Sequence, residues 1–201
     1  MSDVLNWISE NWVEVSAALV SITYVILAIK EIIWLWPFGI LSAILYAWVY
    51  AYSGFYAGMA LQAYYAVISV YGWIHWSART RKLDTKTEVK LPVIRMNRRW
   101  LIILILCWLF LWQGIGFILH KYTNSTIPYW DAFTAAGGIV ATWMIARKIL
   151  EQWLFWIVID IISVGLYVWQ GLYITTLLFI VYIIMAVLGY RQWKKSWMTT
   201  A

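Results

Sequence analysis

Asp160 is the residue of this chain with the clearest chemical potential, because it is the one acid that lies deep inside a long apolar run. It occurs in the segment WLFWIVIDIISVGLYVW, seven residues after Trp153 and nine before Trp169. A charged side chain at the centre of a membrane-spanning helix costs roughly 2.5–3.5 kcal/mol, so it is expected to face a cavity or a partner. We predict that Asp160 contacts a substrate; the alternative is a structural hydrogen bond to a neighbouring helix.

Gln62 is the corresponding candidate in an earlier apolar run. Its amide offers two donors and an acceptor to a flat ligand, although hydrogen bonding between helices explains it equally well. Residues three or four apart share a helix face, and an aromatic ring beside a cation contributes about 0.5–2 kcal/mol. The substrate site predicted from these faces comprises Asp160, Gln62, Trp156, Tyr65, Ser69, Ser42 and Tyr167.

Enzyme chemistry is not indicated by the remaining polar residues. His75 and His120 are predicted to lie on opposite sides of the membrane, so they cannot share a metal or assist Asp160 as a base. The single Cys107 lies within an apolar run and gives neither an internal disulfide nor a set of metal ligands. We therefore predict no catalytic residue, no metal and no cofactor.

The elements that must position these side chains are membrane-spanning helices. The chain has 201 residues, is 64% hydrophobic and only 12% charged, and cannot cover a soluble globule with polar surface. A helix crosses the bilayer with roughly 20 apolar residues. Seven such spans are predicted, over residues 12–29, 34–53, 56–76, 100–119, 129–146, 153–169 and 172–193. The predicted fold is an all-α integral membrane protein in contact with the lipid bilayer.

The basic residues predict the orientation of these spans. Of 15 Lys and Arg residues, all except Lys121 fall on one side of the membrane in the seven-span arrangement. Short basic loops remain in the cytoplasm, so we predict an external N-terminus and a cytoplasmic C-terminus. The same placement explains the net charge of +6 without nucleic acid as a partner. Residues 77–99 carry eight of the basic residues and are predicted to form a solvated cytoplasmic linker.

An internal repeat relates the two ends of the chain. Gly54–Trp76 aligns without a gap to the segment 117 positions later, with seven identities, and an offset of 118 pairs the first span with the fifth. The offset of 118 places Ser42 opposite Asp160. Repeated bundles are common in transporters. The predicted organisation is a three-helix bundle (1–76), the linker (77–99), a connector helix with an external loop (100–128) and a second bundle (129–201), a 3+1+3 parallel repeat similar to SWEET transporters.

Several motifs together resemble the Pnu family of bacterial vitamin transporters. They are WPFGI from Trp36, LQAYY followed by YGWIHW, WDAF from Trp130, and ARKILEQWLFWIVIDIISV from Ala146. The resemblance implies facilitated diffusion across the bacterial inner membrane by alternating access, followed by trapping through a cytoplasmic kinase. It also implies that Gln62, Trp156 and position 160 belong to the substrate region.

The choice of substrate depends on two departures from the nicotinamide riboside branch of that family. This chain has Asp160 where that branch typically shows Asn, and Ser42 where an Asn is also expected. The departures favour thiamine, and nicotinamide riboside is the alternative because both molecules are flat cations. A receptor that binds the vitamin without moving it is the alternative of another class. The sequence is compatible with a homo-oligomer.

Overall fold

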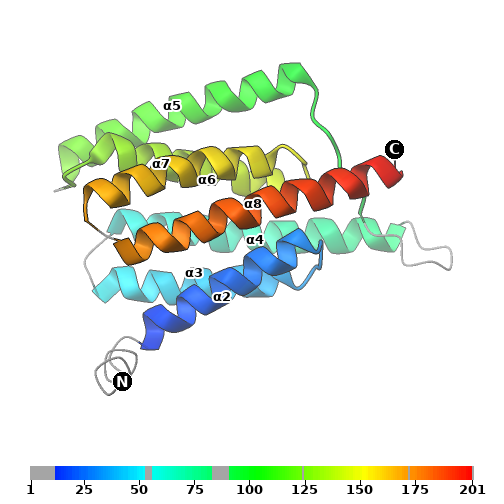
Figure 1. The fold of residues 1–201 in the computed structure, drawn as a ribbon, viewed down its shortest axis with the longest axis horizontal. Coiled ribbons are helices and arrows are strands. Elements are labelled where there is room, and N and C mark those ends of the chain that lie inside the picture. Colours follow the sequence, from blue (N-terminus) through cyan, green and yellow to red (C-terminus); the bar gives the residue numbers. More distant parts are fainter. Residues whose placement is uncertain (1–11, 53–55, 83–90, 124, 172, 201) are drawn as a thin grey trace. The chain divides into compact units, whose positions relative to one another are not determined.

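The computed structural model describes residues 12–52, 56–82, 91–123, 125–171 and 173–200. These residues form seven helices and one isolated bridge, which pairs Ile94 with Ile149 (Figure 1). The helices are α2 (Trp12–Ile29), α3 (Leu35–Tyr52), α4 (Tyr56–Lys82), α5 (Arg98–Tyr122), α6 (Pro128–Ala146), α7 (Gln152–Trp169) and α8 (Tyr173–Thr200). The predicted all-helical fold is therefore confirmed, and α4 and α8 continue six or seven residues beyond the predicted spans.

Three of these helices satisfy strict criteria of length and apolarity for crossing a membrane. They are Arg98–Tyr122, Gln152–Trp169 and the Thr175–Thr199 part of α8, and Val15–Ile29 and Leu35–Ala51 are shorter apolar helices. Long helices of this kind satisfy their backbone hydrogen bonds internally, as a lipid environment requires. Large apolar side chains such as Phe110, 79% exposed, point away from the packed interior of their unit.

The chain divides into two compact units, Met1–Ala78 and Arg79–Ala201. In the first unit, α2 packs against α3, and α3 contacts α4 through two tryptophans. The rings of Trp36 and Trp76 meet edge to face, with centroids 5.4 Å apart and an interplanar angle of 88°. Gly72 lies directly against the Trp36 ring, which would overlap with any added Cβ atom. Glycine at position 72 therefore allows α3 and α4 to approach closely.

The second unit repeats this contact between α7 and α8. The rings of Trp153 and Trp193 also meet edge to face, 5.6 Å apart at 89°, and Gly189 lies against Trp153. All three residues lie 117 positions after their equivalents in the first unit. The indole Nε1 atoms of Trp36 and Trp153 are both buried without a partner in the described part of the chain. The two contacts are therefore equivalent in detail.

The turns that precede these contacts are equivalent as well. Both helices α2 and α6 end in a Schellman motif, in which the amide after the left-handed residue bonds a carbonyl five residues earlier. Ile32 N bonds Leu27 O at 3.0 Å, and Ile149 N bonds Met144 O at 3.0 Å. The left-handed positions are occupied by Glu31 (φ 57°) and Lys148 (φ 58°) rather than by the usual glycine. The backbone hydrogen bonds thus recur at an offset of 117 and not 118.

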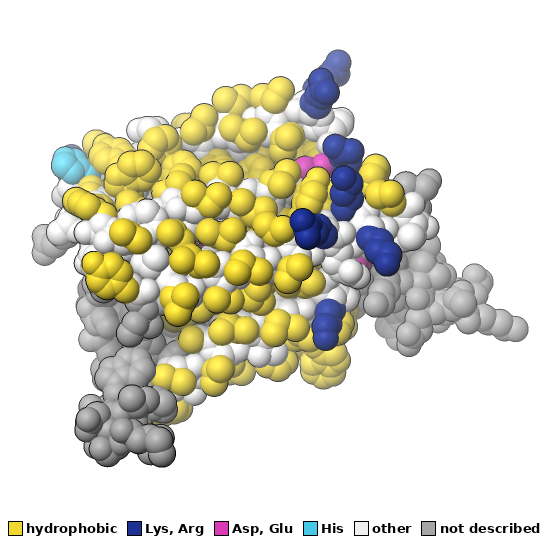
Figure 2. Space-filling view, viewed as in Figure 1, with side chains coloured by type: hydrophobic (Ala, Val, Ile, Leu, Met, Phe, Trp, Pro, Cys, Tyr) yellow, Lys and Arg dark blue, Asp and Glu magenta, His cyan; other side chains and the backbone are white. Residues whose placement is uncertain are grey.

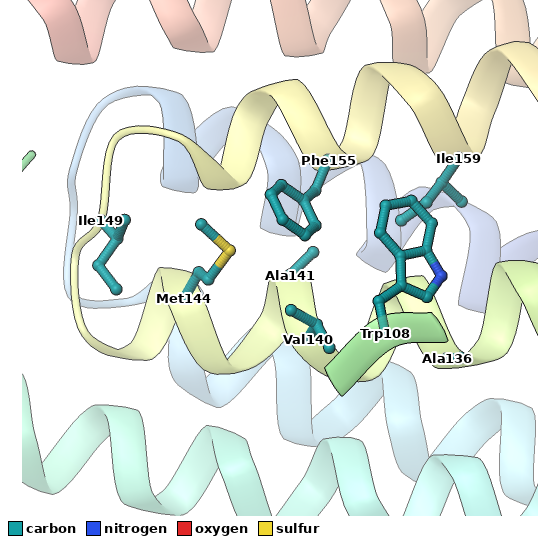
Figure 3. Close-up of a cluster of buried hydrophobic side chains, with 8 residues drawn as sticks. All are labelled: Trp108, Ala136, Val140, Ala141, Met144, Ile149, Phe155 and Ile159. Carbon is teal, nitrogen blue, oxygen red and sulfur yellow. The ribbon is translucent and has the colours of Figure 1, made fainter. Parts of the chain in front are cut away.

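The core of the second unit lies where α5, α6 and α7 converge. Figure 3 shows Phe155 and Ile159 of α7 pointing towards Val140 and Met144 of α6, with the Trp108 ring of α5 beside them. Trp108 Nε1 donates to the carbonyl oxygen of Phe133 on α6 at 3.0 Å. This bond satisfies the polar atom of the ring, so the indole can be buried among apolar side chains.

The segment 91–97 covers the α6–α7 turn of the same unit. Ile94 N donates to Lys148 O and Leu150 N donates to Ile94 O, both at 3.0 Å. Lys148 is buried, and its Nζ atom donates to the carbonyl oxygen of Leu91. Leu91 and Val93 are buried too. We call Leu91–Asn97 the strap; it differs from the solvated linker expected for residues 77–99, because paired backbone groups and buried side chains attach it to the turn.

Glu151 anchors the strap from the start of α7. Its Oε2 atom accepts from Met96 N at 3.1 Å, and its Oε1 atom lies 3.4 Å from Arg95 Nε. The side chain of Glu151 is 10% exposed, whereas that of Arg95 is 59% exposed. These contacts attach the start of α7 to a segment more than fifty residues earlier in the chain.

Candidate functional site

One face of α7 carries most of the predicted site residues of the second unit. Trp156, Asp160, Ser163 and Tyr167 follow one another at helical intervals of four, three and four residues, so they share a face. Asp160 and Ser163 are buried, and Trp156 is partly buried against the apolar core. Tyr167 contacts the ring of Phe179 on α8, with centroids 5.0 Å apart. The structure therefore places the predicted residues Trp156, Asp160 and Tyr167 on one helix surface, together with Ser163.

Asp160 is the most unusual of these residues. It is only 4% exposed, and no hydrogen bond or ion pair reaches its carboxylate from the residues that the structure describes. Its oxygens are not among the fully enclosed polar atoms that lack a partner there. A buried carboxylate without such partners is strongly disfavoured. The arrangement is thus suited to receiving a positively charged or hydrogen-bond-donating ligand rather than to holding two helices together.

The predicted residues of the first unit lie on α4 and α3. Gln62 and Tyr65 are partly buried, and Ser69 is buried one turn further along α4. Ser69 Oγ lies close to Gly39 of α3, where an added Cβ atom would come within 2.9 Å of it. Gln62, Tyr65 and Ser69 therefore share the face of α4 that helical spacing predicted.

Ser42 has a different environment from the one that the sequence suggested. Its Oγ atom lies 2.7 Å from Ser21 Oγ, so it takes part in a hydrogen bond between α3 and α2. In the offset of 117 that the turns and tryptophan contacts follow, Asp160 corresponds to Ala43, while Ser42 corresponds to Ile159. The pairing of Ser42 with Asp160 was wrong because the one-residue difference rotates the position by about 100° around the helix.

Gln152 is a polar residue of α7 that the sequence analysis did not assign to the site. It lies eight residues before Asp160 and four before Trp156, on the same helical face. Its side chain is fully buried, and neither Oε1 nor Nε2 has a hydrogen-bond partner in the described residues. The sequence analysis did not select Gln152 because it lies next to the predicted end of a span, where polar residues are normally solvated.

Charge separates the two ends of the second unit. The basic residues gather at the start of α5, the end of α6 and the end of α8, and Figure 2 shows dark blue side chains at that end of these helices. His120 and Lys121 occur in the last turn of α5, at its opposite end. Within the described residues, no three His, Cys, Asp or Glu side chains are grouped as a metal site would require.

The comparisons with known proteins identify the family of this chain. Residues 11–195 match the model of a family described as nicotinamide mononucleotide transporter. The chain belongs to this family. Since the match extends over nearly the whole chain, the protein is a membrane transporter of the PnuC type and not an enzyme.

Individual relatives are similar over most of their length. The nicotinamide riboside transporter PnuC of Escherichia coli is 24% identical, over 92% of this chain and 86% of that protein. The PnuC of Neisseria mucosa is 27% identical over 92% of this chain and 73% of the relative. The riboflavin/roseoflavin transporter RibM of Streptomyces davaonensis is 23% identical over 94% and 92%.

A solved structure shows the same fold. The crystal structure of the vitamin B3 transporter PnuC superposes with a TM-score of 0.78 and 24% identity, covering 100% of this chain and 88% of the other. The seven helices described for this chain therefore form a known membrane transporter fold.

Proposed function

We propose that this transporter carries a flat, positively charged vitamin across the bacterial inner membrane by facilitated diffusion. The observation that carries the proposal is Asp160, a buried carboxylate on the α7 face without a partner among the described residues. A cationic ligand would place a positive charge beside this negatively charged carboxylate. Hydrogen bonds to a charged group are about twice as strong as those between neutral groups. Trp156, four residues earlier on the same face, would stack on the ring of such a ligand.

Nicotinamide riboside is the first substrate candidate. The relatives from Escherichia coli and Neisseria mucosa carry that compound in their names, whereas the sequence alone had favoured thiamine. The pyridinium ring of nicotinamide riboside is flat and positively charged, and the carboxamide on that ring presents both a donor and an acceptor. The amide of Gln62 can pair with such an edge, since it also presents both.

Thiamine is the second candidate, and Asp160 is the observation that favours it. The amino group on the pyrimidine ring of thiamine can donate to a carboxylate, and its thiazolium ring supplies a positive charge. The carboxylate at position 160 replaces the Asn expected in the nicotinamide riboside branch, and an acid accepts from that amino group more strongly than an amide does.

The proposed transport cycle uses alternating access without ATP hydrolysis, and a cytoplasmic kinase traps the product by phosphorylation. A uniporter requires no second charged group to couple an ion to the substrate. The basic residues at one end of α5, α6 and α8 support a cytoplasmic location for that end and an external N-terminus.

Titration of the purified protein with each vitamin tests the substrate assignment. We expect one of the two compounds to bind. If thiamine binds, Asp160→Asn should raise its Kd more than tenfold, equivalent to about 1.4 kcal/mol, because an amide accepts from the amino group of thiamine less strongly than a carboxylate does. Asp131→Asn is the matched control, because Asp131 is exposed and accepts from Ser125 Oγ at 2.6 Å. An unchanged Kd of thiamine for Asp160→Asn would remove Asp160 from the site.

Uptake into liposomes separates transport from binding alone. Saturable entry of labelled vitamin, without ATP or an imposed ion gradient, is the expected result. Binding without entry would instead indicate a receptor. Preloading the liposomes with a purified kinase and ATP should increase accumulation, because phosphorylation removes the free vitamin.

A further inference from the structure

The comparison of the two units isolates one buried polar residue that the shared packing does not require. Trp36 in the first unit and Trp153 in the second are each preceded by a fully buried residue. This residue is Leu35 in the first unit and Gln152 in the second. The surroundings are alike, since both positions precede a tryptophan that meets a glycine and a second tryptophan. An apolar side chain therefore fills this position without loss of the local structure.

The amide of Gln152 is costly where it lies. Neither Oε1 nor Nε2 has a partner in the described part of the chain, although both atoms are buried. A buried polar group without a hydrogen bond loses its interaction with water and gains nothing in return. The unpaired indoles of Trp36 and Trp153 do not account for the difference, because they occur in both units and belong to the common contact.

The position of Gln152 connects it with transport. It lies four residues before Trp156 and eight before Asp160, on the face of α7 that carries the proposed site. It also directly follows Glu151, which holds the strap at Met96. A movement of α7 or of the strap would change the groups around the Gln152 amide and could supply its missing partner.

We propose that Gln152 is a positioning residue of the transport cycle, whose amide is unpaired in this state and hydrogen-bonded to the protein in another. Such a residue destabilises the present state and stabilises the other one, so it brings the two closer in free energy. A transporter needs both states to be populated, because a large preference for either slows the cycle. The proposal rests on the transport activity and on no particular choice between the two vitamins.

Two substitutions remove the amide while keeping the volume. Gln152→Leu introduces the residue that the first unit carries, and Gln152→Met preserves the length of the side chain. Both should raise the Tm in detergent, by on the order of 2–4 °C, because an unpaired amide is removed from the interior. Both should also slow the initial rate of uptake by about tenfold, with labelled nicotinamide riboside and labelled thiamine tested in parallel.

Leu35→Met is the matched control at the equivalent position. It should leave both the Tm and the uptake rate unchanged, because it replaces one apolar side chain with another of similar volume. The Kd of the vitamin should change less than threefold in both Gln152 variants, since a positioning residue does not contact the ligand.

Three results would overturn the proposal. A lower Tm in both variants would mean that the amide already has a partner, and an unchanged uptake rate would remove Gln152 from the cycle. A Kd raised tenfold or more would assign Gln152 to the substrate itself. If the wild-type protein takes up neither vitamin, the substrate proposal fails, and the direction of the Tm change still decides whether the amide is unpaired.

Discussion

The first unit and the α6–α8 part of the second unit share a tryptophan–glycine contact and a turn but differ in their polar side chains. Trp36, Gly72 and Trp76 recur as Trp153, Gly189 and Trp193 with nearly identical ring geometry. Where the two units differ at buried or partly buried positions, a polar residue in one often corresponds, at the offset of 117, to an apolar residue in the other. Examples of such pairs are Asp160 with Ala43, Gln62 with Phe179, Gln152 with Leu35 and Ser69 with Ala186.

This difference separates the residues that build the packing from those available for binding. The repeated contact needs two tryptophans and a glycine, and it forms with either polar or apolar residues beside it. The polar residues are therefore not required by the helix packing itself. Each can be replaced by its equivalent from the other unit, which is a substitution already known to suit the same backbone.

The strap is the second difference. In the second unit it covers the turn through Lys148, Ile94 and Glu151, whereas the equivalents of Lys148 and Glu151 are Glu31 and the exposed Trp34. The turn itself forms in both units, so the Schellman motif does not depend on the strap. The strap instead provides the partners that allow a lysine and a glutamate to be buried there.

Removing either tryptophan at the centre of the repeated contact should have the largest effect. Trp36→Ala and Trp153→Ala should each lower the free energy of unfolding by about 3–5 kcal/mol, because a large cavity replaces the ring. Denaturant unfolding in detergent micelles measures the loss. Similar values for the two variants would support equivalent contacts, and a loss below 1 kcal/mol in one of them would show that its unit is packed by other residues.

Removing Glu151, which holds the strap, should lower the free energy of unfolding by less than removing a tryptophan does. Glu151→Ala leaves Met96 N without its acceptor and should cost about 1–3 kcal/mol of unfolding free energy. Arg95→Ala is the matched control, and it should cost at most about 1 kcal/mol because the arginine is largely exposed. Equal losses in the two variants would place the stabilisation in the ion pair rather than in the buried hydrogen bond.

Gln62→Phe should affect binding but not stability. Phe179 occupies the equivalent position and contacts Tyr182, whose own equivalent is Tyr65, so we expect phenylalanine to be accommodated on α4 with little change in Tm. Loss of the amide should raise the Kd of the transported vitamin about tenfold, or about 1.4 kcal/mol. Calorimetry gives the Kd, and an unaltered value would indicate that Gln62 has no contact with the ligand.

Much of the fold could be predicted from the sequence because the helices are long and apolar. The predicted start and end of the first span, Trp12 and Ile29, are those of α2. The predicted linker was less accurate, since α4 continues to Lys82 and the strap attaches to the α6–α7 turn. Such attachments join residues more than fifty positions apart, and no local pattern of hydrophobicity reports them.

The candidate site was predictable only in part. Helical spacing correctly placed Trp156, Asp160 and Tyr167 on one face, while their role in binding stays a prediction. Gln152 was missed because it occurs at a span end, where polar residues are usual. Ser42 was paired with the wrong residue because apolar helices align almost equally well at neighbouring offsets, and side-chain identities alone do not distinguish 117 from 118.

The sequence by itself determined the helical membrane fold, the polar faces of α4 and α7, and the presence of a repeat, because these depend on residue type and on local periodicity. Only the tertiary structure decided the offset of that repeat, the burial of Lys148 and Gln152, and the attachment of the strap. Those features depend on which distant groups meet, since a hydrogen bond or a close glycine contact is fixed by packing in three dimensions.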